Sequence, residues 1–271
     1  MIQDIFPSKL HNEYQVAKAS PQDYLLFYNE EGKVYVSVVD GQVTYPQVGQ
    51  EKGNMVYLFA LDDKKYFMAR RELDKEREDF AYWSPRELRD QVEGKEIFAI
   101  FTAYHLWKWY RDNRFCGACG QRLDLGKKER SLVCPTCGHV VYPRINPAVI
   151  VAVTKGDYIL LTKYQRGIGY NALVAGFTEI GETLEETVER EVMEETGLKV
   201  KNIRYYKSQP WGLAQDILAG FVCQVDGDDQ IHMDERELRY AQWVRREDVE
   251  LQPNNLSLTN EMMRKFKEGN L

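Results

Sequence analysis

The sequence predicts an α+β protein, on three observations made along its 271 residues. Short apolar runs separated by turn residues fill the first 83 residues and predict strands. Two Cys-x-x-Cys pairs between residues 116 and 137 indicate a small module held together by its cysteines. After residue 145, further strand-like runs flank a helical pattern at 184–196. We therefore expect three domains, at 1–111, 112–144 and 145–271.

The first domain is expected to be β-rich and to end in helices. Its predicted strands lie at 23–29, 33–39, 55–61 and 64–69. Ser84 and Glu87 form a capping-box pattern with Pro85 between them, which predicts a helix start. The helical pattern continues through 97–113, with a break at Gly94. Because this second helix is aromatic on several sides, we expect it to be buried or to make a subunit contact.

The third domain alternates strands with two helices. Its predicted strands lie at 146–153, 158–164, 203–211, 217–225 and 241–248. The apolar run at 172–177 leads into the helix at 184–196, and a helix at 257–269 closes the chain.

Bulk composition excludes some classes of protein. The chain is 44% hydrophobic and 12% aromatic, enough for a substantial core. A formal net charge of −6 argues against a general polyanion-binding protein. No apolar run is long enough to span a membrane, and the first residues lack the pattern of a signal peptide. We expect a cytoplasmic protein that has no membrane partner.

Four of the five cysteines follow the spacing C-x2-C-x14-C-x2-C, which is typical of a zinc ribbon: Cys116, Cys119, Cys134 and Cys137. Each pair is followed by a glycine that allows a tight knuckle. Disulfides and a redox motif are the alternatives, and zinc is favoured over both in a chain of this type. Four thiolates leave no open coordination position, so the single Zn²⁺ is expected to be structural. Cys223 lies in an apolar run and is expected to be buried.

The ribbon region is basic. Between residues 108 and 144 there are eight Lys or Arg and three Asp or Glu. This surplus could offset the charge of −2 on a zinc bound by four thiolates, or it could attract phosphates. Compensation of the zinc site is the favoured interpretation.

A helix at 184–196 carries a crowded set of glutamates. Thr183 and Glu186 form a capping box, and Gly197 suits the end of the helix. The buried stripe is expected to be Leu184, Val188 and Val192.

Glu191, Glu194 and Glu195 share one face of that helix, and Glu182 lies just before it. Like charges at this spacing repel one another, so the pattern favours a site for a hard divalent cation such as Mg²⁺ or Mn²⁺. Such a cation would polarise a phosphoryl oxygen and stabilise a leaving phosphate. The alternative is a solvated acidic face on which Arg190 pairs with Glu186.

The segment from Gly176 to Leu198 resembles the Nudix box at every fixed position. The matching residues are Gly176, Glu182, Arg190, Glu191, Val192, Glu194, Glu195, Gly197 and Leu198. The resemblance implies an α/β/α sandwich with a mixed sheet and hydrolysis of a nucleoside diphosphate linked to another group. It also implies divalent metal on the box glutamates and catalytic roles for Glu182 and Arg190, with Glu182 orienting Arg190. Which glutamate acts as general base is left open.

The order of the domains resembles the NADH pyrophosphatase branch of the Nudix family. The run from Tyr142 to Pro147 is similar to a Tyr-Pro-Arg-x-x-Pro motif, and Ser208-Gln209-Pro210-Trp211 begins a motif of this branch. The chain then departs from the branch. Gly212-Leu213-Ala214-Gln215-Asp216 replaces a Pro-Phe-Pro-x-Ser continuation, which puts the preferred nucleotide in doubt.

The resemblance also implies further site residues. Tyr142 and Phe177 would stack on the substrate base, with core packing as their alternative role. Glu237 and the carbonyl of Ala175 would complete the metal site, and the alternative for Glu237 is a surface charge. The remaining predicted substrate contacts are Gln209, Pro210, Trp211, Asp216, Glu129 and Arg86.

The leading hypothesis is hydrolysis of NAD(H) to NMN(H) and AMP, extended to the NAD cap of RNA 5′ ends. The alternatives are a Nudix hydrolase of another nucleotide, such as ADP-ribose, and an inactive nucleotide-sensing or RNA-binding protein. The intact glutamates argue against the inactive protein. A homodimer is expected from the resemblance and from the aromatic helix.

Overall fold

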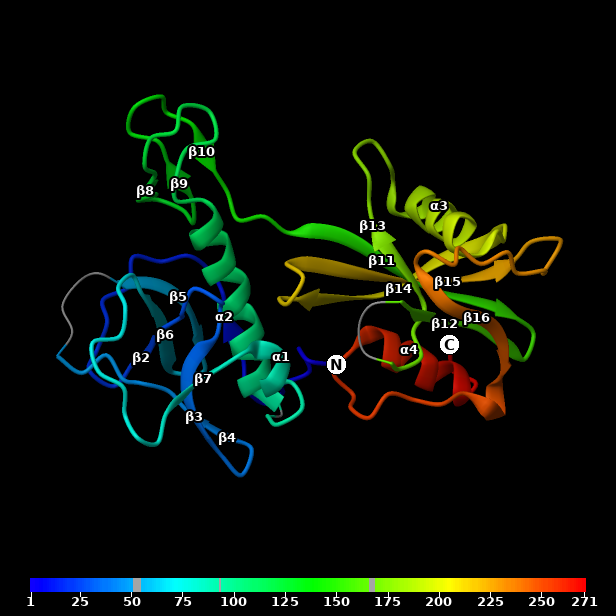
Figure 1. The fold of residues 1–271 in the computed structure, drawn as a ribbon, viewed down its shortest axis with the longest axis horizontal. Helices are drawn as coiled ribbons and strands as arrows, with labels where there is room; N and C mark the ends of the chain where they lie inside the picture. Colours follow the sequence, from blue (N-terminus) through cyan, green and yellow to red (C-terminus); the bar gives the residue numbers. More distant parts are fainter. Residues whose placement is uncertain (51–54, 93, 166–168) are drawn as a thin grey trace. The chain divides into compact units, whose positions relative to one another are not determined.

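The computed structural model describes residues 1–50, 55–92, 94–165 and 169–271. The chain divides into two compact units, each visible in Figure 1. The N-terminal unit comprises 3–144 together with 212–215, and the C-terminal unit comprises 1–2, 145–211 and 216–271. The ribbon belongs to the N-terminal unit. The expected division into three domains stays a prediction.

The C-terminal unit is built on a six-stranded sheet. Its strands are β11 (Asn146–Lys155), β12 (Tyr158–Tyr164), β13 (Val174–Phe177), β14 (Val200–Trp211), β15 (Asp216–Val225) and β16 (Leu238–Arg245). The order is β14-β15-β11-β12-β16, and β13 also pairs with β11. Strands β11 and β15 run parallel and the other pairs are antiparallel, so the sheet is mixed as expected.

A helix covers each face of this sheet, as Figure 1 shows. Because side chains alternate along a strand, Val149, Val151 and Val153 of β11 point to one face and pack in a cluster with α3 (Leu184–Thr196). Ile150 and Ala152 point to the other face and join the core with α4 (Leu258–Lys267). The predicted α/β/α sandwich is confirmed.

Helix α3 has the boundaries that the sequence predicts. Thr183 accepts a hydrogen bond from the backbone N–H of Glu186, whose carboxylate in turn accepts from the N–H of Thr183. Gly197 ends the helix with φ 72°, a conformation that glycine adopts without a Cβ penalty. Val188 and Val192 are fully buried, so the apolar side of the helix packs against the sheet.

The N-terminal unit contains three smaller sheets. The first has the strand order β1 (Leu10–His11), β5 (Met55–Leu61), β6 (Lys64–Ala69) and β2 (Tyr24–Leu26). The second has the order β4 (Gln42–Thr44), β3 (Val34–Val39) and β7 (Ala81–Trp83). The third, in the ribbon, has the order β10 (Val140–Val141), β9 (Leu132–Val133) and β8 (Asp124–Leu125). The four predicted strands of this region are present. The sequence missed six other strands of two or three residues, because segments so short carry no alternation: β1, β4, β7, β8, β9 and β10.

Two helices connect these sheets. The predicted capping box of Ser84 and Glu87 is confirmed, but α1 (Pro85–Leu88) has a single turn. Helix α2 (Gly94–Asp112) is separate, and Gly94 has φ 60°, which places the expected break there. Trp109 of α2 is buried and packs with Cys116 and Cys134, so the aromatic helix supports the ribbon.

Two other expectations can be compared with the structure. The strand expected at 241–248 ends at Arg245, and Arg246–Asp248 form a 3-10 turn instead (η1), so that boundary was wrong. Cys223 is buried as predicted. None of the helices in the described ranges combines the length and the apolar character needed to cross a bilayer.

Candidate functional site

The four ribbon cysteines converge on one point. Their Sγ atoms all lie within 4.8 Å of one another. The Cys116–Cys137 and Cys119–Cys134 Sγ separations are 3.7 and 3.5 Å, far longer than a disulfide bond. A Zn–S distance of about 2.3 Å in a tetrahedron places sulfurs about 3.8 Å apart. The geometry therefore fits one Zn²⁺ and excludes disulfides between these residues.

The backbone of the second knuckle lowers the pKa of one of the four thiols, that of Cys134. Gly120 and Gly138 have φ values of 76° and 74°, which turn the chain back beneath each pair. Backbone N–H groups of Cys137 and Thr136 donate to the sulfur of Cys134 and lower the pKa of its thiol to about 6. Since zinc binds the thiolate, this favours the ligand form.

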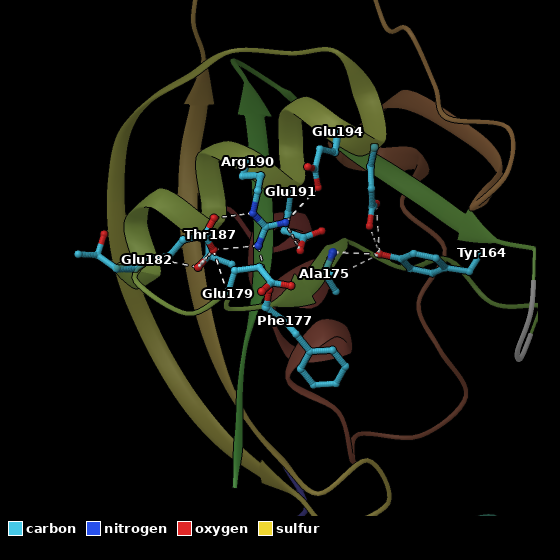
Figure 2. A network of polar contacts seen from close by, with 11 residues as sticks. Tyr164, Ala175, Phe177, Glu179, Glu182, Thr187, Arg190, Glu191 and Glu194 are labelled. Carbon is cyan, nitrogen blue, oxygen red and sulfur yellow. Dashed lines mark hydrogen bonds and ion pairs between the residues drawn. The ribbon is translucent and has the colours of Figure 1, made fainter.

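Arg190 of α3 lies at the centre of the second site, where Figure 2 shows it surrounded by acceptors. Its Nε and Nη2 donate to the two carboxylate oxygens of Glu182 at 2.6 and 2.9 Å. Its Nη1 lies 2.8 Å from Glu191 and 3.0 Å from Glu194, and Nη2 also donates to the carbonyl of Phe177. The planar guanidinium thus ties the helix to the loop before it.

This contact set decides between the two sequence interpretations of Arg190. The pairing of Arg190 with Glu186, expected for a solvated face, does not form, because Glu186 is used in the helix cap. The hydrogen bonds from Arg190 hold the pKa of Glu182 to about 2. Glu182 also accepts from Thr187 and from the backbone of Glu179. Its carboxylate therefore positions the loop and Arg190.

Glu195 is the buried acid of the site. Its side chain is 2% exposed. Burial, together with the charges of Glu191 and Glu237, raises the pKa of Glu195 to about 8. The hydroxyl of Tyr164 donates to its carboxylate at 3.0 Å and accepts from the backbone N–H of Ala175 at 2.9 Å. Tyr164 thereby fixes Glu195 beside the Ala175 peptide, at the edge of β13, where the family would place a metal ligand.

Tyr164 is the site residue that sequence reasoning missed. It lies 31 residues before Glu195 and in no motif, and only the folding of β12 alongside the α3 layer brings the two together. The tyrosine-rich composition of the chain offers no signal that singles it out.

Gly176 is required by the position of Glu191. A Cβ built at Gly176 would lie 1.9 Å from the Glu191 carboxylate. The absent side chain therefore makes the space in which Glu191 sits against β13. Burial raises the pKa of Glu191, and the charges of Glu194 and Glu237 act in the same direction.

In the described part of the chain, the predicted acidic metal ligands lie near one another but do not form a compact cluster of ligand atoms. Among the described residues, the cysteine quartet is the one set of three or more candidate ligands within 4.8 Å. Glu194 is exposed and turned toward Arg190, and Glu237 is exposed near Glu191 and Glu195. Glu191 and Glu194 both contact Arg190, and the gathering of the four glutamates around a divalent cation stays a prediction.

The predicted stacking residues are accessible. Tyr142 and Phe177 are 56% and 52% exposed, so neither packs in a core. The hydroxyl of Tyr142 donates to Glu129 at 2.9 Å, so these two predicted contacts lie together in the N-terminal unit. In Figure 2 the ring of Phe177 projects away from the glutamates. Their contact with a substrate base stays a prediction.

Three predicted substrate contacts, Gln209, Pro210 and Trp211, lie at the end of β14 and differ in exposure. Gln209 is fully buried, donates to the carbonyl of Leu256 and accepts from the backbone N–H of Leu258, each at 2.8 Å. This side chain anchors α4, and a substrate contact would require breaking both bonds. Pro210 is exposed and Trp211 is half-buried.

Asp216 and Arg86 differ sharply in exposure. Asp216 is 5% exposed, and its Oδ1 has no partner among the described residues. Burial raises the pKa of its carboxyl to about 7. Arg86 is exposed on α1 of the other unit.

Comparison with known proteins agrees with this geometry. The NUDIX domain family matches residues 144–266, and the NADH pyrophosphatase zinc ribbon domain matches 111–142. This chain contains a Nudix domain. Its Nudix fold is shared by a NUDIX hydrolase from Nitrosomonas europaea, with a TM-score of 0.50, 21% identity, and coverage of 57% of this chain and 91% of that one.

Curated relatives of this Nudix protein are more similar in sequence. It is 42% identical over 172 residues to "NAD-capped RNA hydrolase NudC" of Salmonella schwarzengrund (strain CVM19633), covering 63% of this chain and 66% of that protein. It is 45% identical over 149 residues to the protein of that name from Enterobacter sp. (strain 638), covering 55% and 57%. The matched region thus spans less than two thirds of these relatives.

The donor set of the Nudix site fits a divalent cation. Glu195 is buried close to Ala175 and Glu191 is partly buried against Gly176, and the negative charge of Glu191 contributes to the raised pKa of Glu195. A buried carboxyl group is stable in its charged form only when a nearby cation compensates the charge, and otherwise it binds a proton. Oxygen ligands of this type suit Mg²⁺ or Mn²⁺.

Proposed function

We propose that this protein hydrolyses the pyrophosphate bond of NAD(H), giving NMN(H) and AMP, and that it removes the NAD cap from RNA 5′ ends. The observation that carries the proposal is the pair of acids in an intact Nudix box, Glu195, which is buried, and Glu191, which is partly buried against Gly176 of β13. The zinc ribbon domain and the names of the relatives support the choice of substrate.

Each residue of the site has a separate role in this proposal. Glu191, Glu194, Glu195, Glu237 and the Ala175 carbonyl would hold Mg²⁺ or Mn²⁺, which when bound supplies charge neutralisation of the pyrophosphate and of the leaving phosphate. Arg190 positions Glu191 and Glu194 while its bidentate pairing with Glu182 fixes the loop. Tyr164 holds Glu195 in place. Tyr142 and Phe177 offer exposed rings to a flat base.

The zinc has a structural role in this proposal, because the four thiolates complete a tetrahedral site. We further propose that the protein is cytoplasmic and acts as a homodimer. Sedimentation would test the dimer directly.

A second candidate, hydrolysis of ADP-ribose, is favoured by the loop at 212–216. A Cβ at Gly212 would lie 2.0 Å from the carbonyl oxygen of Phe101, so the proline that the NADH pyrophosphatase branch has there cannot be accommodated. The loop at 212–216 therefore has a different conformation from the Pro-Phe-Pro-x-Ser loop that the NADH pyrophosphatase branch uses to prefer NADH.

The deciding experiment is a product assay with Mg²⁺ or Mn²⁺ and four substrates: NADH, NAD⁺, ADP-ribose and NAD-capped RNA. Release of NMNH and AMP from NADH, or release of NMN with a 5′-monophosphate RNA, supports the proposal. A higher kcat/KM for ADP-ribose than for all the others would contradict it and favour the second candidate.

Glu194→Gln separates an enzyme from an inactive binding protein. Because Glu194 is 61% exposed, we expect the variant to fold normally while kcat falls by roughly 100-fold or more, as is usual when a charge-stabilising group is removed. Unchanged turnover in Glu194→Gln, with a normal melting curve, would remove the box glutamates from the mechanism.

A further inference from the structure

The N-terminal unit contains a cavity of about 300 Å³ that the proposed hydrolytic reaction does not use. It is lined by the end of β6, by the last turns of α2 and by the ribbon. Five of its lining residues are arginines, Arg70, Arg71, Arg111, Arg114 and Arg122, against one acid, Glu72. None of the four ribbon cysteines lines it.

Most of these arginines lack a partner of opposite charge. Arg71 is paired with Asp74 at 2.8 Å. Within the described part of the chain, Arg70, Arg111, Arg114 and Arg122 form no ion pair with a carboxylate. These four arginines are exposed. Unpaired guanidinium groups that share a concave surface repel one another and attract an anion.

Some of the basic residues between 108 and 144 have polar partners within the described parts of the N-terminal unit, and others do not. Lys108 pairs with Asp112, Arg130 donates to the carbonyls of Asn12 and Leu58, and Arg144 donates to Gln215. By contrast, Arg111, Arg114 and Arg122 face the cavity. These three arginines therefore place part of the basic surplus at the cavity.

Aromatic groups lie beside the arginines. Tyr28 stacks on Trp107 with ring centroids 5.0 Å apart, and the guanidinium of Arg111 lies 5.1 Å from the Trp107 ring. This contact holds Arg111 in a fixed position, and its plane and the ring of Tyr110 give the cavity flat surfaces. The hydroxyl of Tyr28 is buried and has no hydrogen-bond partner among the described residues, so a polar group of a ligand would satisfy it.

We propose that this cavity is a second nucleotide-binding site, separate from the Nudix box, in which the arginines hold a phosphate and the flat groups hold a base. Its volume is at the lower end of the range for small-molecule pockets, which suits a single nucleotide. Guanidinium groups match phosphate oxygens in geometry and stack on bases. A free nucleotide and one nucleotide of an RNA chain share this chemistry.

The test is a binding titration of the full-length, zinc-loaded protein in buffer without added Mg²⁺ or Mn²⁺. Two labelled probes are used: AMP, and an uncapped single-stranded RNA of about eight nucleotides with a 5′-monophosphate. Because the titration measures binding and needs no catalytic cation, its failure and a failure of the proposed hydrolysis are distinguishable.

The double variant Arg111→Glu/Arg122→Glu should weaken binding of at least one probe by 10-fold or more, since two phosphate-facing charges are reversed. It should also reduce the slope of log K against log salt by about 1–2. Arg77→Glu is the matched control. Arg77 is an exposed arginine that lies 4.2 Å from the Phe80 ring but outside the cavity, and its variant should bind within 2-fold of wild type.

The outcomes assign the ligand. Loss of AMP binding indicates a site for a free nucleotide, and loss of RNA binding alone indicates that the cavity holds part of an RNA chain. Equal affinities in wild type and double variant, or an equal loss in Arg77→Glu, would overturn the proposal. Melting curves and zinc content check folding, and Arg111→Gln/Arg122→Gln replaces the double variant if charge reversal prevents folding.

Discussion

At the scale of single residues, Gly176 shows why the Nudix box begins with glycine. The Glu191 carboxylate occupies the place where a side chain of Gly176 would lie. The clashing atoms belong to the end of a flexible side chain, so the protein can fold with alanine there by moving Glu191. Folding and positioning of the acid are therefore separable at this residue.

We expect Gly176→Ala to lower kcat by roughly 100-fold while the free energy of unfolding changes by about 1 kcal/mol or less. The readouts are turnover of the best substrate and a denaturant titration. Gly169→Ala is the control, since a Cβ at Gly169 meets its nearest atom at 3.6 Å. Retained turnover in Gly176→Ala would mean that the position of Glu191 is not critical.

Asp216 gives a prediction of pH dependence. Burial raises the pKa of its carboxyl to about 7 from an ordinary value near 3.8. The folded state therefore holds the proton more tightly than the unfolded state. The associated stability is fully present below about pH 4 and is lost as the pH rises through 7.

Asp216→Asn should accordingly raise the Tm at pH 8 and change it little at pH 4, because the amide carries no charge to bury. Thermal melts of the ligand-free protein across this range test the idea. A Tm difference that is independent of pH would show that the carboxyl does not titrate in this window.

At the scale of elements, α3 could be predicted from the sequence to its last residue. Its cap, its apolar stripe and its C-terminal glycine all act within a few residues, so local patterns determine them. Helix α1 was harder, because its capping box is correct but only one turn follows it. The strands of two residues in the ribbon are held by the zinc knuckles and tertiary pairing, which carry no periodic signal.

Thr183→Ala should destabilise the C-terminal unit by about 1 kcal/mol, because it removes the side-chain acceptor for the N–H of Glu186. A decrease in Tm of about 2–4 °C corresponds to this loss. Glu189→Ala, an exposed substitution within the same helix, is the comparison and should leave the Tm nearly unchanged. Equal effects of the two would mean that the cap contributes nothing measurable.

At the scale of the whole molecule, packing against α2 joins the four-cysteine ribbon to the rest of the N-terminal unit. Cys116 and Cys134 are buried against Trp109 of α2, so loss of the metal would expose both the thiols and this helix contact. Structural zinc contributes apparent energies on the order of 10 kcal/mol to small metal-bound modules.

We expect one zinc per chain in the wild type and none in Cys119→Ser, with an earlier thermal transition in the zinc-free protein. Metal analysis and calorimetry with and without a strong chelator provide the readouts. Cys223→Ser removes a buried thiol from the C-terminal sheet and should keep its zinc. An unchanged melting curve after complete removal of zinc would contradict the structural role.

The sequence by itself determined the Nudix helix and the four predicted zinc ligands, because each depends on local spacing, whereas the mixed sheet followed only from the resemblance to the Nudix family. The tertiary structure alone decided what surrounds them. It placed the Tyr164 hydroxyl against Glu195, paired Arg190 with three glutamates and buried Gln209 under α4. It also gathered arginines around one cavity from the segment after β6, from α2 and from the ribbon. These contacts join residues far apart in the chain, and their energies depend on burial and on neighbouring charges, which no local pattern records.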